Sequence, residues 1–163
     1  MKLKKLYRSR EVAALTGLSA KQLQWWDRRH VIAPSVPSHR TESGGFTERR
    51  YTSVELLELM VLADLRRRGF SVARLRRLIG VLQSRFKVRL FEAIEGGGPV
   101  TLFIDGRDIY ARTETGELFN VLNRPEQPLL IVGQDLRLRE LTARERRPPR
   151  SRPRASQPGQ GPR

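Results

Sequence analysis

Two adjacent tryptophans, Trp25 and Trp26, lie in a stretch that is otherwise mostly polar and basic. Adjacent positions on an α-helix point about 100° apart, so one helix face cannot bury both rings. Leu23 and Trp26 fall on one face, whereas Lys21, Trp25 and Arg28 fall on another. An exposed aromatic ring beside cations can lie along a sugar-phosphate backbone, with its indole N–H donating to a phosphate oxygen. We therefore expect Trp26 in the core and Trp25 on an exposed strip. Burial of Trp25 under a neighbouring hairpin is the alternative.

Basic charge is concentrated in the first part of the chain. The net charge is +15, and residues 1–90 hold 20 Lys and Arg against 7 Asp and Glu, whereas residues 91–142 hold 5 against 9. A polyanion supplies the counter-charge that such a segment needs. This distribution predicts a nucleic-acid-binding module. The alternative is a chain in which arginine is simply common on every surface.

Several function classes are excluded by what the sequence lacks. There is no cysteine, and two histidines alone do not make an imidazole metal site. No apolar run approaches the ~20 residues that span a bilayer, and no apolar segment follows the basic start. Neither a phosphate-binding glycine loop nor a paired histidine and nucleophile is present, and Gly96–Gly98 is interpreted as a hinge. We expect a cytoplasmic protein that is not an enzyme and needs no cofactor.

The elements that position the tryptophans can be predicted from capping signals. A helix over residues 9–16 ends at Gly17, and Ser19 with Gln22 forms a capping box for a second helix that runs to about His30. This pair predicts a helix-turn-helix unit. Residues 33–51 then predict a hairpin or extended loop. Thr52 with Glu55 caps a third helix, and a fourth begins after Ser71.

The second half of the chain changes its hydrophobic period from helical to alternating. A short helix over residues 88–95 precedes the glycines, and strands are expected at residues 100–104, 108–112, 118–122 and 129–132. The fold class is therefore α+β, with a winged helix-turn-helix domain at 6–86, a short helix and hinge at 87–98, and a small antiparallel β domain at 99–142. Five of the ten prolines lie in residues 143–163, which predicts a disordered basic tail.

Several linked motifs resemble the MerR family of bacterial transcription regulators. These motifs are Glu11-Val-Ala13, Gly17-Leu-Ser19, Trp25-Trp-Asp27, Arg49-Arg-Tyr51 and Gly69-Phe-Ser71. The resemblance covers roughly residues 6–83. It implies a homodimer that binds a promoter operator in double-stranded DNA, with RNA polymerase as a further partner and association with the nucleoid. It does not say whether an effector binds.

The chain departs from the family pattern at three places. Gln24 stands where the family usually has an arginine, and the wing is about two residues longer. The long fifth helix that pairs family subunits is missing or short. The sheet segment is similar to the C-terminal part of a smaller subset of MerR-like proteins.

The resemblance assigns contact roles to nine residues. Glutamine pairs well with adenine and lysine with guanine in the major groove. Base readout is expected from Lys21, Gln22 and Gln24, and backbone or minor-groove contact from Trp25, Arg28, Arg40, Arg49, Arg50 and Tyr51. A surface ion pair worth ~0–1 kcal/mol is the alternative for Arg28 and for Arg49.

Two other functions stay open from the sequence alone. The first is a basic nucleoid- or RNA-associated protein without operator specificity. The second is an antitoxin-like or adaptor module whose sheet binds a protein partner. The β domain could bind a small molecule, pair two subunits or cap the helices.

Overall fold

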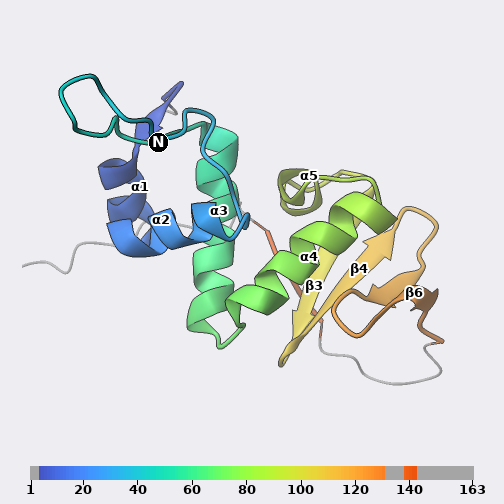
Figure 1. Ribbon diagram of the computed structural model, residues 1–163. Helices are drawn as coiled ribbons and strands as arrows, with labels where there is room; N and C mark the ends of the chain where they lie inside the picture. Colours follow the sequence, from blue (N-terminus) through green and yellow to red (C-terminus); the bar gives the residue numbers. More distant parts are fainter. Residues whose placement is uncertain (1–3, 131–137, 143–163) are drawn as a thin grey trace, which may run out of the picture.

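The computed structural model describes residues 4–130 and 138–142, and it has the α+β architecture that the sequence predicts. The chain starts with the strand β1 (Tyr7–Arg8) and the helices α1 (Ser9–Thr16) and α2 (Ala20–Arg28). The strand β2 (Arg50–Tyr51) leads into α3 (Ser53–Arg67) and α4 (Val72–Arg85), followed by the short α5 (Leu90–Ile94). Figure 1 shows α1, α2 and α3 as one helical head, with α4 leading away from it.

Both predicted capping boxes are present and set where the helices begin. The Ser19 hydroxyl accepts the Gln22 N–H at 3.1 Å, and the Ser19 N–H donates to the Gln22 carboxamide at 2.8 Å. Thr52 and Glu55 repeat the arrangement at the start of α3. The second helix ends at Arg28 rather than His30, because His30 takes a left-handed conformation with φ of 55° that no α-helix continues through.

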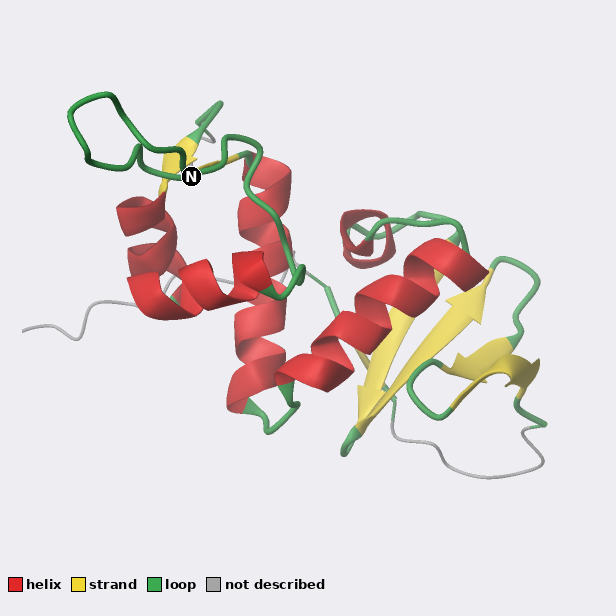
Figure 2. Cartoon of the chain, viewed as in Figure 1, coloured by secondary structure: helices red, strands yellow, loops and turns green. Residues whose placement is uncertain are grey.

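The C-terminal part forms a five-stranded antiparallel sheet. Its strands are β3 (Val100–Asp105), β4 (Asp108–Thr113), β5 (Leu118–Asn120), β6 (Arg124–Pro128) and β7 (Arg139–Glu140), in the order β6-β5-β4-β3-β7. Helix α4 lies across one face of this sheet (Figure 2). Arginines of α4 donate to backbone carbonyls of the sheet segment: Arg77 to Leu122 at 2.7 Å and Arg85 to Pro125 at 3.1 Å.

One expected strand is absent at the two of its residues that the structure describes, Leu129 and Leu130. The sequence predicts a buried strand over residues 129–132, but Leu130 is 93% exposed, and residues 131 and 132 lie outside the described part. The last strand before them is β6, at the edge of the sheet. Proline has no N–H to donate, and an edge strand tolerates this because it pairs on one side only. The strand expected over residues 118–122 is also shorter. It is β5, which ends at Asn120 because residues 121–123 form a turn.

A single apolar cluster extends from the helical head into the sheet. It includes Trp26 and Leu59 of the head together with Leu102, Ile109 and Val121 of the sheet segment. The segments before and after the glycines at 96–98 therefore share one core, while the proposed domain limits remain a prediction. The expected tail, 143–163, lies outside the described residues.

The short α5 is held against α3 by a buried carboxylate. Glu58 is 1% exposed, and its carboxylate accepts the Arg89 Nε–H at 2.9 Å and the Phe91 N–H at 3.2 Å. With only five residues, α5 has no length for the intersubunit helix that the family resemblance implies. This departure is thus present in the structure as well as in the sequence.

Candidate nucleic-acid interface

Helix α2 has one buried face and one exposed face. Leu23 and Trp26 are each 2% exposed and belong to the common core. Because successive residues of a helix point about 100° apart, the neighbours Gln22, Gln24 and Trp25 lie off this buried face. Lys21, Gln22, Gln24, Trp25 and Arg28 together line a shallow hollow on the outer side of α2. The structure therefore brings five of the nine candidate contact residues onto one surface strip, which we call the α2 strip.

Trp25 lies on the α2 strip and not beneath the hairpin. Its side chain is 42% exposed, and it belongs to neither of the two apolar clusters of the described residues. The guanidinium carbon of Arg29 lies 5.0 Å from the ring centroid, a cation–π arrangement. An exposed indole with one cation over its face keeps its edge and N–H available to a ligand.

The two glutamines of the α2 strip are not equivalent. The Gln22 carboxamide oxygen accepts the Ser19 N–H at 2.8 Å, so this side chain closes the capping box. Bidentate pairing with adenine needs both the oxygen and the NH₂ of the amide. Gln24 is half-buried and makes no side-chain hydrogen bond to any described residue, so it keeps both groups available. Gln24 is the better candidate for reading a base.

The loop between α2 and β2 forms the wing (residues 36–50), which is an extended loop with two isolated bridges rather than a regular hairpin. Val36 bridges to Arg50 at its base, and Arg40 bridges to Phe46 near its tip. Thr41 closes the tip, because its N–H donates to the Gly45 carbonyl at 2.7 Å. Arg40 is exposed on this loop, away from the α2 strip.

Arg49 is engaged within the protein. Its Nε–H donates to the Asp27 Oδ2 at 2.8 Å, and the two side chains are 22% and 23% exposed. This ion pair joins the wing to the last turn of α2. The alternative interpretation of Arg49 as an ion-paired residue therefore fits the structure, whereas Arg28 is exposed and has no ion pair among the described residues.

Tyr51 does not lie on the surface, and its assignment as a phosphate contact is corrected here. The side chain is 1% exposed, and its hydroxyl has no hydrogen-bond partner among the described residues. Desolvation by burial, with the Asp27 carboxylate as the next cause, raises the pKa of Tyr51 to about 12. The ring lies in the same apolar cluster as Leu56, at the two positions that form a hydrophobic staple around the Thr52 N-cap.

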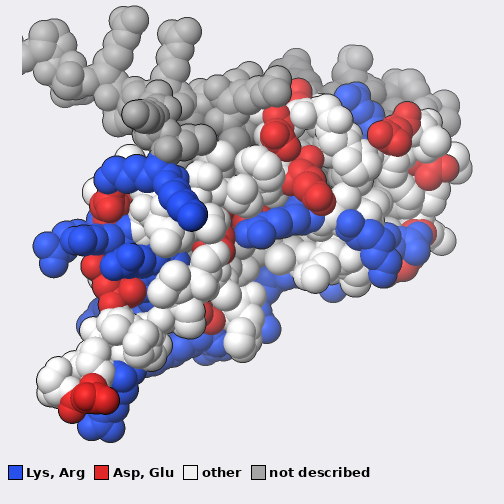
Figure 3. Space-filling view, turned by 90° about the horizontal axis from the view of Figure 1, so that it is seen from above, with Lys and Arg blue, Asp and Glu red and all other residues white. Residues whose placement is uncertain are grey.

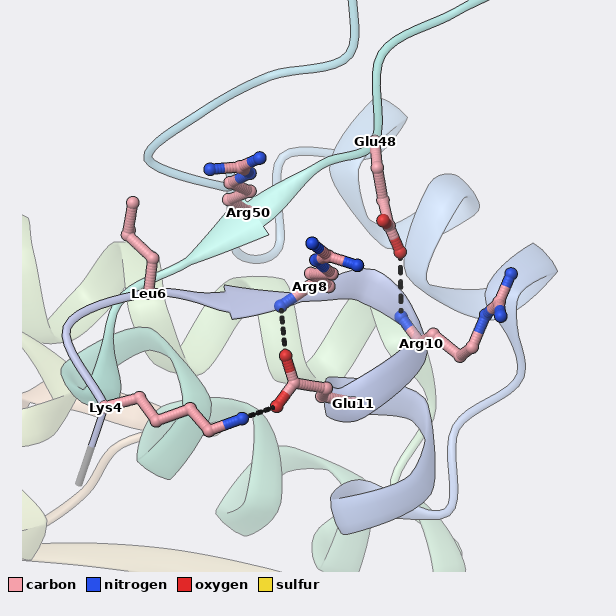
Figure 4. Close-up of a pocket in the computed structure, with 7 residues that line it drawn as sticks. All are labelled: Lys4, Leu6, Arg8, Arg10, Glu11, Glu48 and Arg50. Carbon is pink, nitrogen blue, oxygen red and sulfur yellow. Dashed lines mark hydrogen bonds and ion pairs between the residues drawn. The ribbon is translucent and has the colours of Figure 1, made fainter. Parts of the chain in front are cut away.

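A second group of cations, which the sequence reasoning missed, surrounds a hollow beside β1 and β2. Figure 4 shows Lys4, Arg8, Arg10 and Arg50 around it, with Glu11 and Glu48. The Glu11 carboxylate accepts hydrogen bonds from the Lys4 ammonium group and from the Arg8 backbone N–H. These bonds, the one from Lys4 having the larger effect, lower the pKa of Glu11 below its ordinary value. Only the pairing of β1 with β2, which are separated by over forty residues, brings these side chains together. Arg50 is the one member that the sequence had indicated.

The surface of the head is accordingly basic. Figure 3 shows blue side chains gathered at the end of the molecule formed by α1 and the wing, with a few red ones between them. Among the described residues, no group of three or more His, Asp or Glu side chains is placed to hold a metal ion. None of the helices described is both long and apolar enough to cross a bilayer.

This geometry can now be compared with known proteins. The family model of MerR HTH family regulatory proteins matches residues 7–80, from β1 through most of α4. Residues 7–80 are therefore similar to the helix-turn-helix domain of the MerR family. The match covers the α2 strip and the wing of this MerR-type head, and it stops before the sheet.

Relatives that are described as uncharacterized HTH-type transcriptional regulators match a longer part of the chain. HTH-type transcriptional regulators of Mycobacterium bovis and of Mycobacterium tuberculosis are 26% identical over 136 residues, which is 83% of this chain and 56% of each relative. The chain thus spans little more than half the length of these relatives. A crystal structure of a MerR-family transcriptional regulator from Bacillus cereus is 22% identical, covers 49% of this chain and 53% of its own, and has a TM-score of 0.36.

Proposed function

We propose that the chain is a sequence-specific regulator of transcription that binds double-stranded DNA. Helix α2 enters the major groove and the wing follows the flanking backbone or the minor groove. The observation that carries this proposal is the division of α2, because Leu23 and Trp26 are buried while Lys21, Gln24 and Trp25 share one outward hollow. A helix anchored on one side and polar on the other has the form that major-groove readout requires.

Four residues of the α2 strip have distinct roles in this proposal. Lys21 and Gln24 donate to or pair with base edges, and Arg28 holds a phosphate. The Trp25 ring lies against the sugar-phosphate backbone, with Arg29 stacked on its face at 5.0 Å. Arg40 carries positive charge into the groove beside the wing. Arg49 sets the angle of the wing through Asp27, at 2.8 Å, and contributes to binding indirectly.

The assembly and its setting are parts of the same proposal. A homodimer presents two α2 helices to half-sites about one helical turn apart, roughly 34 Å. Since α5 has only five residues, the subunits pair through another surface. RNA polymerase is the expected further partner at the promoter, and the protein works in the cytoplasm on nucleoid DNA.

A competition titration separates this function from nonspecific binding to nucleic acid. Labelled DNA from upstream of the chain's own gene is titrated at fixed salt, with random duplex and RNA as competitors. Specific binding exceeds nonspecific binding by ~10³ or more in this class of protein. A ratio below about tenfold would support a general nucleoid- or RNA-associated protein instead. Co-purification of a small protein that binds the sheet would support the adaptor function.

A further inference from the structure

The two-stranded ribbon of β1 and β2 has an aromatic face and an arginine face. Its register places Tyr7 opposite Tyr51 and Arg8 opposite Arg50. The tyrosines are 3% and 1% exposed, so the inner face belongs to the core. Side chains alternate along a strand, so Arg8 and Arg50 lie together on the outer face. Figure 4 shows both arginine side chains extending from the ribbon on its solvent side.

This arginine pair is unfavourable in the free protein. Like charges directly opposite each other on an antiparallel pair destabilise it. No hydrogen bond or ion pair among the described residues engages the guanidinium group of Arg8, Arg10 or Arg50. The ribbon has only two residues in each strand, so it has little other pairing to offset the repulsion.

The nearby carboxylates compensate the pair only in part: the Glu11 carboxylate interacts with the Arg8 charge, but no ion pair among the described residues joins it to the Arg8 guanidinium group. Glu11 accepts from the Lys4 ammonium group and from the Arg8 backbone N–H at 3.4 Å. Glu48 accepts the backbone N–H of Arg10 at 3.4 Å. Figure 4 shows these bonds ending on the Lys4 ammonium group and on the backbone nitrogens of Arg8 and Arg10. Among the described residues, the guanidinium groups of Arg8 and Arg50 are therefore left without a paired carboxylate.

We propose that Arg8 and Arg50 together bind one phosphodiester group of the DNA backbone, with Arg10 beside them. This inference rests on the proposed function and extends its contact surface to the first strand. Guanidinium groups bind phosphate through paired, charge-assisted hydrogen bonds, and a phosphate shared by two of them offsets their mutual repulsion. We call this pair the ribbon clamp.

The ribbon clamp is fixed to the elements that read DNA. The N–H and the hydroxyl of Ser9 both donate to the Arg49 carbonyl at 3.1 Å, which joins the start of α1 to the wing. Arg49 in turn holds Asp27 at the end of α2. A phosphate bound by the clamp therefore sets the register of α2 in the groove, as backbone contacts do.

The test compares the full-length protein with Arg8→Gln, Arg50→Gln and the double variant. Arg76→Gln is the matched control, because Arg76 is exposed on α4 and has no side-chain partner among the described residues. Binding to a random-sequence duplex is measured over a range of salt concentrations. A random duplex is used because a phosphate contact does not depend on operator specificity.

Each single variant should bind about tenfold more weakly at low salt. Its loss from the slope of log K against log salt should not exceed about 0.9, the value for one phosphate contact. The double variant should lose about 0.9 in all and not twice that value, because both arginines bind the same phosphate. Arg76→Gln should keep the wild-type slope. Wild-type slopes in all clamp variants would overturn the clamp while DNA binding stands.

A second measurement needs no DNA. Without anions, Arg8→Gln and Arg50→Gln should melt at or above the wild-type temperature, because each removes the like-charge opposition. A lower melting temperature in both would show a structural role and overturn the clamp. If the wild type binds no duplex, the proposed function itself fails. If inorganic phosphate then stabilises the wild type but not the variants, the pair binds a free phosphate and the DNA assignment is overturned.

Discussion

The Arg49 guanidinium group and the Asp27 carboxylate form an ion pair at 2.8 Å that connects the base of the wing to the last turn of α2. Both side chains are less than a quarter exposed, at 22% and 23%. The pair spans two elements that would contact different parts of one DNA site. We therefore expect the ion pair to act mainly by fixing the angle between the wing and α2.

The first prediction concerns this pair. Asp27→Asn should lower the free energy of unfolding by only ~0–1 kcal/mol, as for other partly exposed ion pairs. The free-energy difference between specific and random DNA binding should fall by more than this loss of stability, because the wing loses its fixed angle. A double-mutant cycle with Arg49→Gln measures the coupling by melting and by titration. An unchanged specificity ratio in Asp27→Asn would show that the pair does not position the wing.

The second prediction separates the two tryptophans. Trp26→Ala removes a ring that is 2% exposed and should destabilise the fold by ~3–5 kcal/mol. Trp25→Ala should leave the melting temperature nearly unchanged and weaken DNA binding. Thermal unfolding and duplex titration of both variants check this. Equal destabilisation by the two substitutions would refute the assigned roles.

The third prediction separates the two glutamines. Gln22→Ala opens the capping box and should cost about 0.5–1 kcal/mol of stability. Gln24→Ala should leave stability unchanged but lose ~1–3 kcal/mol of discrimination at one base pair, because its amide is the free one. Melting curves and titration against single-base operator variants measure both effects. Loss of discrimination in Gln22→Ala alone would reverse the assignment.

These predictions show what the sequence could and could not provide. The faces of α2 and the capping residues Ser19 and Thr52 are local features, so spacing predicts them. The Asp27–Arg49 pair joins residues twenty-two positions apart, and the Arg8–Arg50 pair depends on a ribbon of two residues per strand. No local pattern encodes such contacts, which arise from tertiary packing.

The edge strand β6 shows a different limit. Residues Arg124–Pro128 include two prolines and a glutamate, which are poor strand formers, so the apolar run after them was the natural candidate. Pairing with β5 on one side only makes those prolines acceptable. Tyr51 was misassigned for a similar reason, because the arginines beside it suggested the surface although its own position in β2 faces inward.

The fourth prediction uses the buried Tyr51 hydroxyl, for which the described part of the chain offers no hydrogen-bond partner. Tyr51→Phe should be neutral or stabilising below pH 10, since it removes an unsatisfied polar group. The pKa of Tyr51 is raised from 10.0 to about 12 in the folded chain. Because the unfolded state then releases its proton first, stability that is complete below pH 10 should fall as the pH rises toward 12.

Chemical unfolding at a series of alkaline pH values measures this effect. The decline should be smaller in Tyr51→Phe than in the wild type, and Tyr110→Phe is a control for the other tyrosine whose pKa burial raises. An identical decline in wild type and Tyr51→Phe would mean that the hydroxyl finds a partner or solvent. A large loss of DNA affinity in Tyr51→Phe would restore its role as a contact.

Selection from a pool of randomised duplex DNA measures sequence reading by α2 most directly, since it requires no knowledge of the operator. Wild-type protein should enrich a recurring motif. The Lys21→Ala, Gln24→Ala double variant should still retain DNA but lose preference at base pairs within that motif. A pool that stays random at every position while the wild type still retains DNA would contradict the account.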